Sequence, residues 1–463
     1  MKYISTRGGV KPLDFEDVLL EGLAADGGLF VPETWPEIAH RDIAGLANAP
    51  YAAVAFHILK PYLGTMLSDA ELEDLLRDTY RDFQHSAVTP LKQIGPGEWL
   101  LELFHGPTLA FKDLAMQLLG RLFDIALARR GQAITVIGAT SGDTGAAAVE
   151  AIRGRKAAKV FILHPLGRVS EVQRRQMTTV QDANVHNIAI EGTFDDCQRI
   201  VKTLFTDRPF REATNLAGIN SINWARAMAQ VVYYFVAAIH LGSPNRAVQF
   251  SVPTGNFGDI LAGYIANKMG LPISQLTIAT NVNDILARTL ETGIYEPQNV
   301  AATLSPSIDI QVSSNFERLL FDVERGRADK VMAYMQDLSQ AGQFTLSEAA
   351  SGAIGRAFKA ARVDEDTTLA TMRSVYEETG EIIDPHTAVG VAAGRACRLE
   401  GLTPLVHLAT AHPAKFPDAV ERAIGLRPPL PPHLSDLYDR PERFGTLAAD
   451  VEAVKSHILE ASR

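Results

Sequence analysis

Residues 133–148 read AITVIGATSGDTGAAA and contain the three parts of a βα unit in one short stretch. The run 133–137 is apolar and rich in β-branched residues, which predicts a buried strand. Small residues and glycines follow at 138–145, and a helical pattern continues over 145–153. A strand, a glycine-rich loop and a helix in this order are typical of α/β folds with parallel sheets.

The same alternation extends on both sides of this stretch. Gly131, at the end of one apolar helical run, suits the left-handed position that often follows a helix. We expect strands at 159–163, 185–190, 248–252, 276–279 and 405–409, and helices at 111–130, 170–180, 222–241, 260–269 and 284–290. These units predict parallel sheets covered by helices, with ligands bound at the carboxyl ends of the strands.

The pattern of residue types along the sequence suggests three regions. Residues 1–95 are mainly helical by pattern, with acidic amphipathic stretches such as 69–76. We expect a smaller α/β domain at 96–225 and a larger one at 226–463. The proline-rich segment 428–432 and the helical tail after it are interpreted as a wrap-around terminus that belongs to the larger domain.

Composition excludes several classes of protein. The 463 residues include 44 Lys and Arg against 54 Asp and Glu, a formal charge of −10, and no basic stripe that would suit nucleic acid. The two cysteines, Cys197 and Cys397, have no metal-ligand spacing and suggest a reducing compartment. The start of the chain lacks the apolar core of a signal peptide, and the run 228–241 is too short and too polar to span a bilayer. We therefore expect a cytoplasmic protein without a metal site or membrane partner.

Two glycine-rich loops suit anions. The loop at 138–145 and the loop PTGNFGD at 253–259 each follow a predicted strand and precede a helix. Small residues let backbone N–H groups point at a ligand, and the helix adds its positive end. Asp259 would repel an anion, so we expect it to cap the helix. Neither loop is a Walker A or Gly-x-Gly-x-x-Gly motif, and plain βα connectors are the alternative.

Lys112 lies in the run FHGPTLAFKD at 104–113, between a Gly-Pro-Thr turn and an apolar helical pattern. Apolar surroundings lower the pKa of a lysine, and a neutral amine can form a Schiff base with an aldehyde. Taken alone, a solvated lysine at a helix start is the more common case. Together with two anion-suited loops, however, Lys112 indicates an aldehyde cofactor with a phosphate and an acidic substrate, which pyridoxal phosphate and an amino acid would satisfy.

Several ordered motifs resemble the threonine synthase family, in its longer bacterial and fungal type. The resemblance covers nearly the whole chain. It rests on KYISTR at 2–7, ADGGLFVP at 25–32, ELFHGPTLAFKD at 102–113, SGDTG at 141–145, NSINWAR at 220–226, GNFGD at 255–259 and TAHPAKF at 410–416. It implies the fold type II architecture of pyridoxal-phosphate enzymes, with two αβα domains, the cofactor in the cleft between them and a mainly helical N-terminal region.

The resemblance also implies roles for individual residues. Lys112 would hold the cofactor as a Schiff base and then shuttle protons. The backbone of Gly255, Asn256, Phe257, Gly258 and Asp259 would bind the cofactor phosphate, Thr410 the pyridine nitrogen, and Asp143 would lie near the 3-oxygen. Ser141, Gly142 and Thr144 would receive the substrate carboxylate, while Asn220, Ser221 and Arg226, with Thr144, would contact the substrate phosphate.

The implied enzyme is a carbon–oxygen lyase acting on phosphates. It would eliminate phosphate from O-phospho-L-homoserine and add water to give L-threonine, the last step of threonine biosynthesis, as a monomer or weak homodimer. The alternatives are a pyridoxal-phosphate lyase that releases 2-oxobutyrate and a non-catalytic relative that only binds. A dinucleotide-dependent oxidoreductase is disfavoured, because no Gly-x-Gly-x-x-Gly is followed by an acidic residue at the required spacing.

Several polar residues also have an ordinary structural interpretation. Arg226 could be a surface charge, Lys415 a solvated loop lysine and His105 a packed histidine. Asn223 suits the first turn of a helix, Asn283 and Asp284 suit a cap, and residues 384–387 suit a turn.

Overall fold

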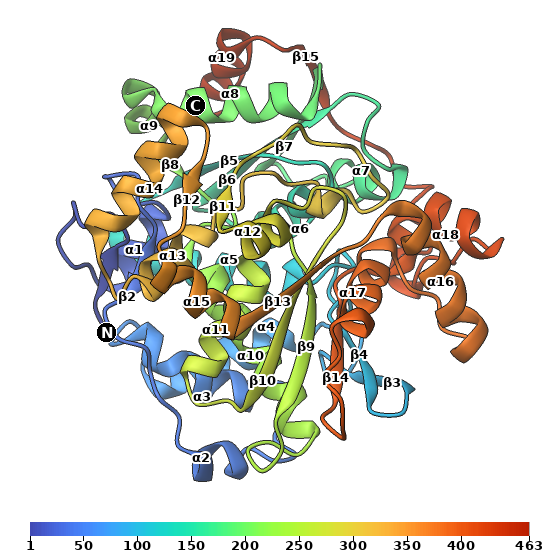
Figure 1. Cartoon of the computed structure of the whole chain (residues 1–463). Helices are drawn as coiled ribbons and strands as arrows, with labels where there is room; N and C mark the ends of the chain where they lie inside the picture. The colour runs from blue at the N-terminus through green and yellow to red at the C-terminus, as the bar shows by residue number, and fades with distance from the viewer. Residues whose placement is uncertain (463) are drawn as a thin grey trace.

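The computed structural model describes residues 1–462. Its strands form two large sheets and two small ones, and helices surround both large sheets (Figure 1). Neighbouring strands in the large sheets are parallel, apart from one antiparallel pair. The predicted α/β class with parallel sheets is therefore confirmed.

The larger sheet has six strands in the order β13-β10-β9-β14-β4-β3. Its antiparallel pair, β3 and β4, lies at one edge. The strands predicted at 248–252, 276–279 and 405–409 fall within β9, β10 and β14. The bounds are β3 (Leu91–Gly95), β4 (Glu98–Glu102), β9 (Val248–Pro253), β10 (Ile273–Thr280), β13 (Phe358–Arg362) and β14 (Leu405–Ala409).

The second sheet has five parallel strands in the order β15-β7-β6-β5-β8. Its side chains alternate between two apolar layers, because successive residues of a strand point to opposite faces. In β6, Phe161 and Leu163 pack with α8 (Phe194–Thr206) and α19 (Val451–Ser462), whereas Val160 and Ile162 belong to the largest apolar cluster of the protein, the main core. The bounds are β5 (Ile134–Ala139), β6 (Ala158–Pro165), β7 (Val185–Glu191), β8 (Leu216–Ala217) and β15 (Gly445–Ala448).

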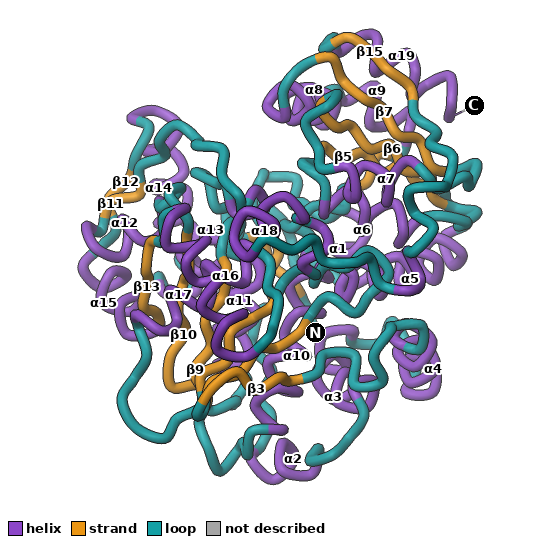
Figure 2. The backbone as a smooth tube through the Cα atoms, turned by 90° about the vertical axis from the view of Figure 1, so that its right-hand side faces the viewer, coloured by secondary structure: helices purple, strands orange, loops and turns teal. Residues whose placement is uncertain are grey.

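Helices cover both faces of the five-stranded sheet. Figure 2 shows α8, α9 and α19 beside the strands in the upper lobe, and α5 and α6 below them. Gly131 ends α5 in the left-handed conformation, with φ 60° and ψ 34°, as predicted. The bounds are α5 (Lys112–Arg130), α6 (Asp143–Ile152), α7 (Glu171–Thr178), α8 (Phe194–Thr206), α9 (Arg208–Thr214) and α19 (Val451–Ser462).

The remaining helices surround the six-stranded sheet and the segment that leads to it. Helix α10 is buried from Trp224 to Ile239, as its apolar sequence predicts. No helix within residues 1–462 is both long and apolar enough to cross a membrane. The bounds are α10 (Trp224–His240), α11 (Gly258–Lys268), α12 (Ile285–Thr292), η1 (Pro306–Ile308), α13 (Phe316–Val323), α14 (Ala328–Ala341), α15 (Glu348–Ala357), α16 (Glu365–Thr379), α17 (Pro385–Ala396), η2 (Pro413–Lys415), α18 (Pro417–Ile424) and η3 (Pro432–Leu434).

The N-terminal region is mainly helical and packs on the main core. Its apolar side chains, such as Tyr3 and Tyr62, are buried with Trp224 of α10. The bounds are α1 (Phe15–Glu21), α2 (His40–Gly45), α3 (Tyr51–Leu63) and α4 (Asp69–Tyr80). Two small antiparallel sheets pair β1 (Tyr3–Ser5) with β2 (Phe30–Pro32) and β11 (Ile294–Tyr295) with β12 (Phe344–Thr345).

Some strands pair with strands from another of the predicted domain ranges 1–95, 96–225 and 226–463. The ranges themselves stay predictions. Strand β4, at the start of the second range, pairs with β14 in the larger sheet. Strand β15, near the end of the third range, pairs with β7 in the smaller sheet. The segment after 428–432 thus contains a strand as well as the expected helix, and it joins the smaller sheet.

Candidate functional site

Lys112 is the first residue of α5 and lies beside the carboxyl ends of β4 and β14. The segment between β4 and α5 pairs with the segment after β14, because Ala110 and Ala411 form a bridge and the Phe111 N–H donates to the Thr410 carbonyl at 2.9 Å. The side chain of Lys112 is buried. Burial lowers its pKa, the Asp143 carboxylate opposes that shift, and the charges of Lys415 and Arg226 lower the pKa further.

Asp143 begins α6, after β5, and its carboxylate faces Lys112. The Lys112 Nζ lies 3.3 Å from Oδ2. The Ser307 hydroxyl donates to the same oxygen at 2.8 Å, and Gln173 Nε2 donates to Oδ1 at 2.8 Å. Burial by itself would raise the pKa of Asp143, but the charges of Lys415 and then Lys112 hold it well below its usual range.

Lys415 is a second lysine at this carboxylate. It ends η2, just beyond β14, and its side chain is fully buried. Its Nζ lies 2.8 Å from Asp143 Oδ1 and donates to the Thr108 carbonyl at 2.7 Å. The interpretation of Lys415 as a solvated loop lysine is therefore wrong, because the turn after β14 directs the side chain inward.

The first glycine-rich loop folds around a threonine side chain. Thr140 Oγ1 accepts hydrogen bonds from the N–H groups of Gly142 and Gly145, each at 2.9 Å. Gly142 has φ 144°, and a Cβ there would collide with the side chain of Gln173. Within residues 1–462, the N–H groups of 141, 143 and 144 meet no acceptor. These donors suit a carboxylate, whereas the N–H of Gly142 is already used by Thr140. The assignment of Ser141, Gly142 and Thr144 to the substrate carboxylate stays a prediction.

The second glycine-rich loop opens α11 without a side-chain cap. Phe257, not a glycine, takes the left-handed conformation, with φ 62°. In the described part of the chain, no acceptor meets the N–H groups of 256, 257 and 258. A nest of free donors at a helix start suits a phosphate. A Cβ on Gly255 would lie 3.0 Å from atoms of the 307–310 segment, so this loop fits tightly against η1.

Asp259 does not cap α11, contrary to the expectation from sequence. Its Oδ1 accepts hydrogen bonds from the hydroxyls of Tyr233 at 2.6 Å and Tyr234 at 2.9 Å, while Oδ2 is buried without a partner among the described residues. Burial raises the pKa of Asp259 to about 6, against the lowering effect of both hydroxyls and of Lys112. The carboxyl turns toward α10 because the tyrosines there offer donors.

Arg226 lies in the first turn of α10 and is buried, so the surface interpretation is wrong. Its Nη1 donates to the Ile219 carbonyl at 3.2 Å, and burial lowers its pKa to about 10. Asn220 and Ser221 lie in the turn before α10 and are partly buried. Asn315 joins this turn to the second loop, because its Nδ2 donates to the carbonyls of Ser221 at 3.2 Å and Asn256 at 3.1 Å.

Other polar residues have structural positions. Asn223 caps α10 by accepting from the Ala225 N–H at 3.0 Å, and it donates to the Leu19 carbonyl at 3.0 Å. Asp384 caps α17 through the N–H groups of 386 and 387. His105 lies 2.8 Å from Glu102. Asp284 occupies the cap position of α12, but its carboxylate pairs with Arg288 instead of the backbone.

The residues at this site fit pyridoxal phosphate. A buried lysine with a lowered pKa can bond an aldehyde, and the free N–H groups at the start of α11 can receive a phosphate. Arg226 Nε and Asp259 Oδ2 are buried polar atoms without partners within residues 1–462, and both lie on elements that border Lys112. Unpaired buried groups of this kind are often completed by a ligand.

Three further residues hold the site, and the sequence patterns did not indicate them. Gln173 and Ser307 contact Asp143, and Asn315 joins the two phosphate-suited segments. His386 supports Ser307 by accepting its N–H at 3.0 Å, and its other ring nitrogen lies 2.6 Å from Asp384. All lie in segments distant along the chain, so no local spacing connects them with Lys112.

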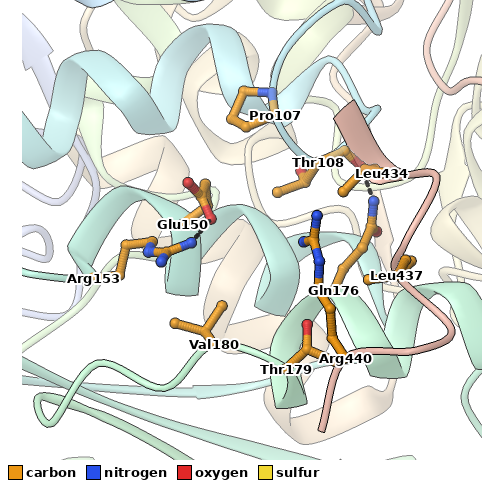
Figure 3. Close-up of a pocket in the computed structure, with 10 residues that line it drawn as sticks. All are labelled: Pro107, Thr108, Glu150, Arg153, Gln176, Thr179, Val180, Leu434, Leu437 and Arg440. Atoms are coloured by element: carbon orange, nitrogen blue, oxygen red, sulfur yellow. Dashed lines mark hydrogen bonds and ion pairs between the residues drawn. The ribbon is translucent and has the colours of Figure 1, made fainter. Parts of the chain in front are cut away.

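Two cavities lie next to the site, but neither is lined by Lys112 or Asp143. One, of about 260 Å³, is bordered by Thr108, Glu150, Gln176 and Arg440 (Figure 3). There Gln176 Nε2 donates to the Thr108 carbonyl at 3.1 Å, the same oxygen that Lys415 contacts. The other, of about 560 Å³, is bordered by His105, His412 and the proline-rich segment 428–432.

Comparisons with known proteins cover nearly the whole chain. The family model "Threonine synthase N terminus" matches residues 2–80, "Pyridoxal-phosphate dependent enzyme" matches 83–410, and "Threonine synthase, C-terminal" matches 387–458. A threonine synthase of Pseudomonas aeruginosa is 53% identical over 462 residues, covering 99% of this chain and 98% of that protein. The threonine synthase of Saccharomyces cerevisiae is 43% identical, covering 99% of this chain and 97% of that protein.

Solved structures extend the similarity to the whole fold. The crystal structure of a pyridoxal-phosphate-bound threonine synthase from Brucella melitensis has a TM-score of 0.97 and 54% identity, with 100% of each chain covered. The yeast threonine synthase structure has a TM-score of 0.94 and 42% identity, covering 99% of this chain and 98% of that one. The resemblance in the sequence motifs is thus confirmed, and the chain belongs to the threonine synthase family of pyridoxal-phosphate-dependent enzymes.

Proposed function

We propose that the site around Lys112 uses pyridoxal phosphate to convert O-phospho-L-homoserine and water into L-threonine and phosphate, the last step of threonine biosynthesis. The observation that carries the proposal is the position of Lys112, which is buried between two anion-suited loops and beside Asp143. Family membership supports the cofactor and the activity, since the relatives at 53% and 43% identity are named threonine synthases.

The amine of Lys112 has two tasks in this proposal. It would hold the cofactor, and as a free amine it would take the proton from the substrate's α carbon and later return it. Pyridoxal phosphate, when bound, makes that proton acidic and accepts the electron pair left behind. The lowered pKa of Lys112 supports both tasks, because a larger fraction of the amine is neutral near pH 7.

The two glycine-rich loops and Arg226 each bind a different anionic group of the substrate or cofactor in this proposal. The N–H groups at 141, 143 and 144 would bind the substrate carboxylate. Those at 255–259 would hold the cofactor phosphate, and the Thr410 hydroxyl would hold the pyridine nitrogen. Arg226, with Asn220 and Ser221, binds the phosphate that leaves. The burial of Arg226 supports this role, because its guanidinium forms a single hydrogen bond within residues 1–462 and retains donors for an anion.

A product assay tests the proposed function. Purified protein is saturated with pyridoxal phosphate and incubated with O-phospho-L-homoserine, and the amino acid, oxoacid and phosphate are measured together. The proposal expects threonine and phosphate in equal amounts. Phosphate with 2-oxobutyrate would identify the alternative lyase, and no phosphate release would identify a binding protein without catalysis.

We further propose a cytoplasmic enzyme that acts as a monomer or weak homodimer. Both cysteines are free thiols, which fits a reducing compartment. Its formal charge of −10 supports a small-molecule substrate over nucleic acid as the partner. Light scattering over a range of protein concentrations tests the oligomeric state.

A further inference from the structure

Lys415 is unusual among the lysines of this chain because its side chain is fully buried. A buried ammonium group is costly unless it is paired and hydrogen-bonded. Lys415 meets that requirement with two partners, the Asp143 carboxylate at 2.8 Å and the Thr108 carbonyl at 2.7 Å. It thereby joins the turn after β14 to the start of α6 and to the segment that leads into α5.

The two oxygens of Asp143 have different partners. Oδ1 receives Lys415 and Gln173, each at 2.8 Å, and is therefore held by a short charged contact. Oδ2 receives the Ser307 hydroxyl at 2.8 Å, and Lys112 lies farther away at 3.3 Å. The closer cation of this buried carboxylate is thus Lys415, although Lys112 is the lysine that reacts.

We propose that Lys415 is a positioning residue that acts as the lasting counter-ion of Asp143 and so leaves Lys112 free to react as a neutral amine. The inference rests on the proposed function, because it concerns the amine that holds the cofactor. To form a C=N bond with an aldehyde, Lys112 must present its lone pair, and the aldehyde oxygen leaves as water. A lysine that must lose its charge cannot also be the only counter-ion of a buried carboxylate.

The charged groups that face Lys112 give the sign of the expected effect. Asp143 and Asp259 favour its protonated form, whereas Lys415 and Arg226 disfavour it. His386 faces Asp143 from α17. Removing Lys415 removes a positive charge near Lys112. It also leaves Lys112 as the one lysine within residues 1–462 that pairs with the Asp143 carboxylate. Both changes favour a charged Lys112, so the amine should become neutral only at a higher pH.

The test measures how fast the full-length apoprotein reacts with pyridoxal phosphate at a series of pH values. Borohydride added at short reaction times reduces the C=N bond to the lysine and so fixes the amount that has formed. The midpoint of the rate profile reports the titration of Lys112. For K415M we expect the midpoint to rise by about one pH unit, so that the rate near neutral pH falls about tenfold. D143N should move the midpoint in the opposite direction, and K415R should restore most of the wild-type profile.

Lys455→Met is the matched control, because Lys455 pairs with Asp207 far from the site and its loss should not move the midpoint. If K415M folds poorly, the comparison of D143N with D143N/K415M removes both charges, and the midpoint should again be higher without Lys415. A lower rate at every pH with an unmoved midpoint would overturn the inference and leave Lys415 a structural residue. Failure of the wild-type apoprotein to form any link would instead overturn the proposed function.

Discussion

The guanidinium of Arg226 donates to the Ile219 carbonyl at 3.2 Å, and its Nε is buried without an acceptor among residues 1–462. A buried arginine with donors to spare is suited to a phosphate, because its planar fork can form two charge-assisted hydrogen bonds. The unpaired Nε favours a role for Arg226 in binding an anion over a purely structural role.

Arg226→Ala should therefore impair the use of a phosphorylated substrate. Loss of one charged partner of a buried phosphate typically costs about 2 to 5 kcal/mol, so kcat/KM with O-phospho-L-homoserine should fall by roughly one and a half to three and a half orders of magnitude. The spectral change on adding an unphosphorylated amino acid should stay nearly intact. If both responses fall equally, Arg226 is structural and the phosphate binds elsewhere. Arg226→Lys, which keeps the charge but not the fork, should lie between the two.

Alanine substitutions at Gly255 and Gly258 allow a matched comparison within the second glycine-rich loop. A Cβ at 255 would lie 3.0 Å from Ile308 Cα and the Ser307 carbonyl, whereas one at 258 would have no neighbour closer than 3.5 Å. Gly255→Ala should therefore reduce both the free energy of unfolding of the apoprotein and the affinity for pyridoxal phosphate. Gly258→Ala should change stability by less than about 1 kcal/mol and reduce the affinity alone, because its Cβ has room within the protein but would hinder the approach of the cofactor phosphate to the backbone.

Denaturant unfolding and cofactor titration measure the two effects. Unchanged cofactor affinity in both variants would remove this loop from the site. The valine variants should show the same order with larger effects, since added bulk increases each clash.

Asp259 should make the apoprotein less stable as the pH rises. Burial raises its pKa to about 6 in the folded state, from 3.8 for an exposed carboxyl, so the folded protein holds the proton more tightly. The free energy of unfolding therefore decreases between about pH 4 and pH 6, by an amount on the order of 2 kcal/mol. Asp259→Asn should lack this decrease and be more stable than wild type above pH 6, with little difference near pH 4. A difference that does not change with pH would contradict the raised pKa.

The sequence predicted the elements of the fold more fully than its sheet edges. Central strands such as β9 and β14 are buried along their whole length and rich in apolar residues, so their pattern is strong. Strand β13 has mixed exposure and β15 is largely exposed, and short edge strands of this kind lack the apolar run that marks a central one. The position of β4 in the larger sheet depends on pairing with β14, which no local pattern specifies.

The candidate site shows the same division. Lys112 and the two glycine-rich loops are recognisable because each has a local pattern at a strand end. The partners of Asp143 could not be predicted in this way, because Gln173, Ser307 and Lys415 come from three separate segments that only the folded chain brings together. Asp259 was placed wrongly as a helix cap, since its two tyrosine donors lie on α10 rather than on its own helix.

The identity of the lysine that bears the cofactor tests the account most directly. Protein saturated with pyridoxal phosphate is reduced with borohydride, digested and mapped by mass spectrometry, with Lys112→Ala and Lys415→Met treated in parallel. We predict one phosphopyridoxyl group on Lys112 in the wild type, the same label on Lys112 in Lys415→Met, and neither label nor threonine formation in Lys112→Ala. A label on Lys415 or any other lysine in the wild-type protein, or full activity of Lys112→Ala, would contradict the account.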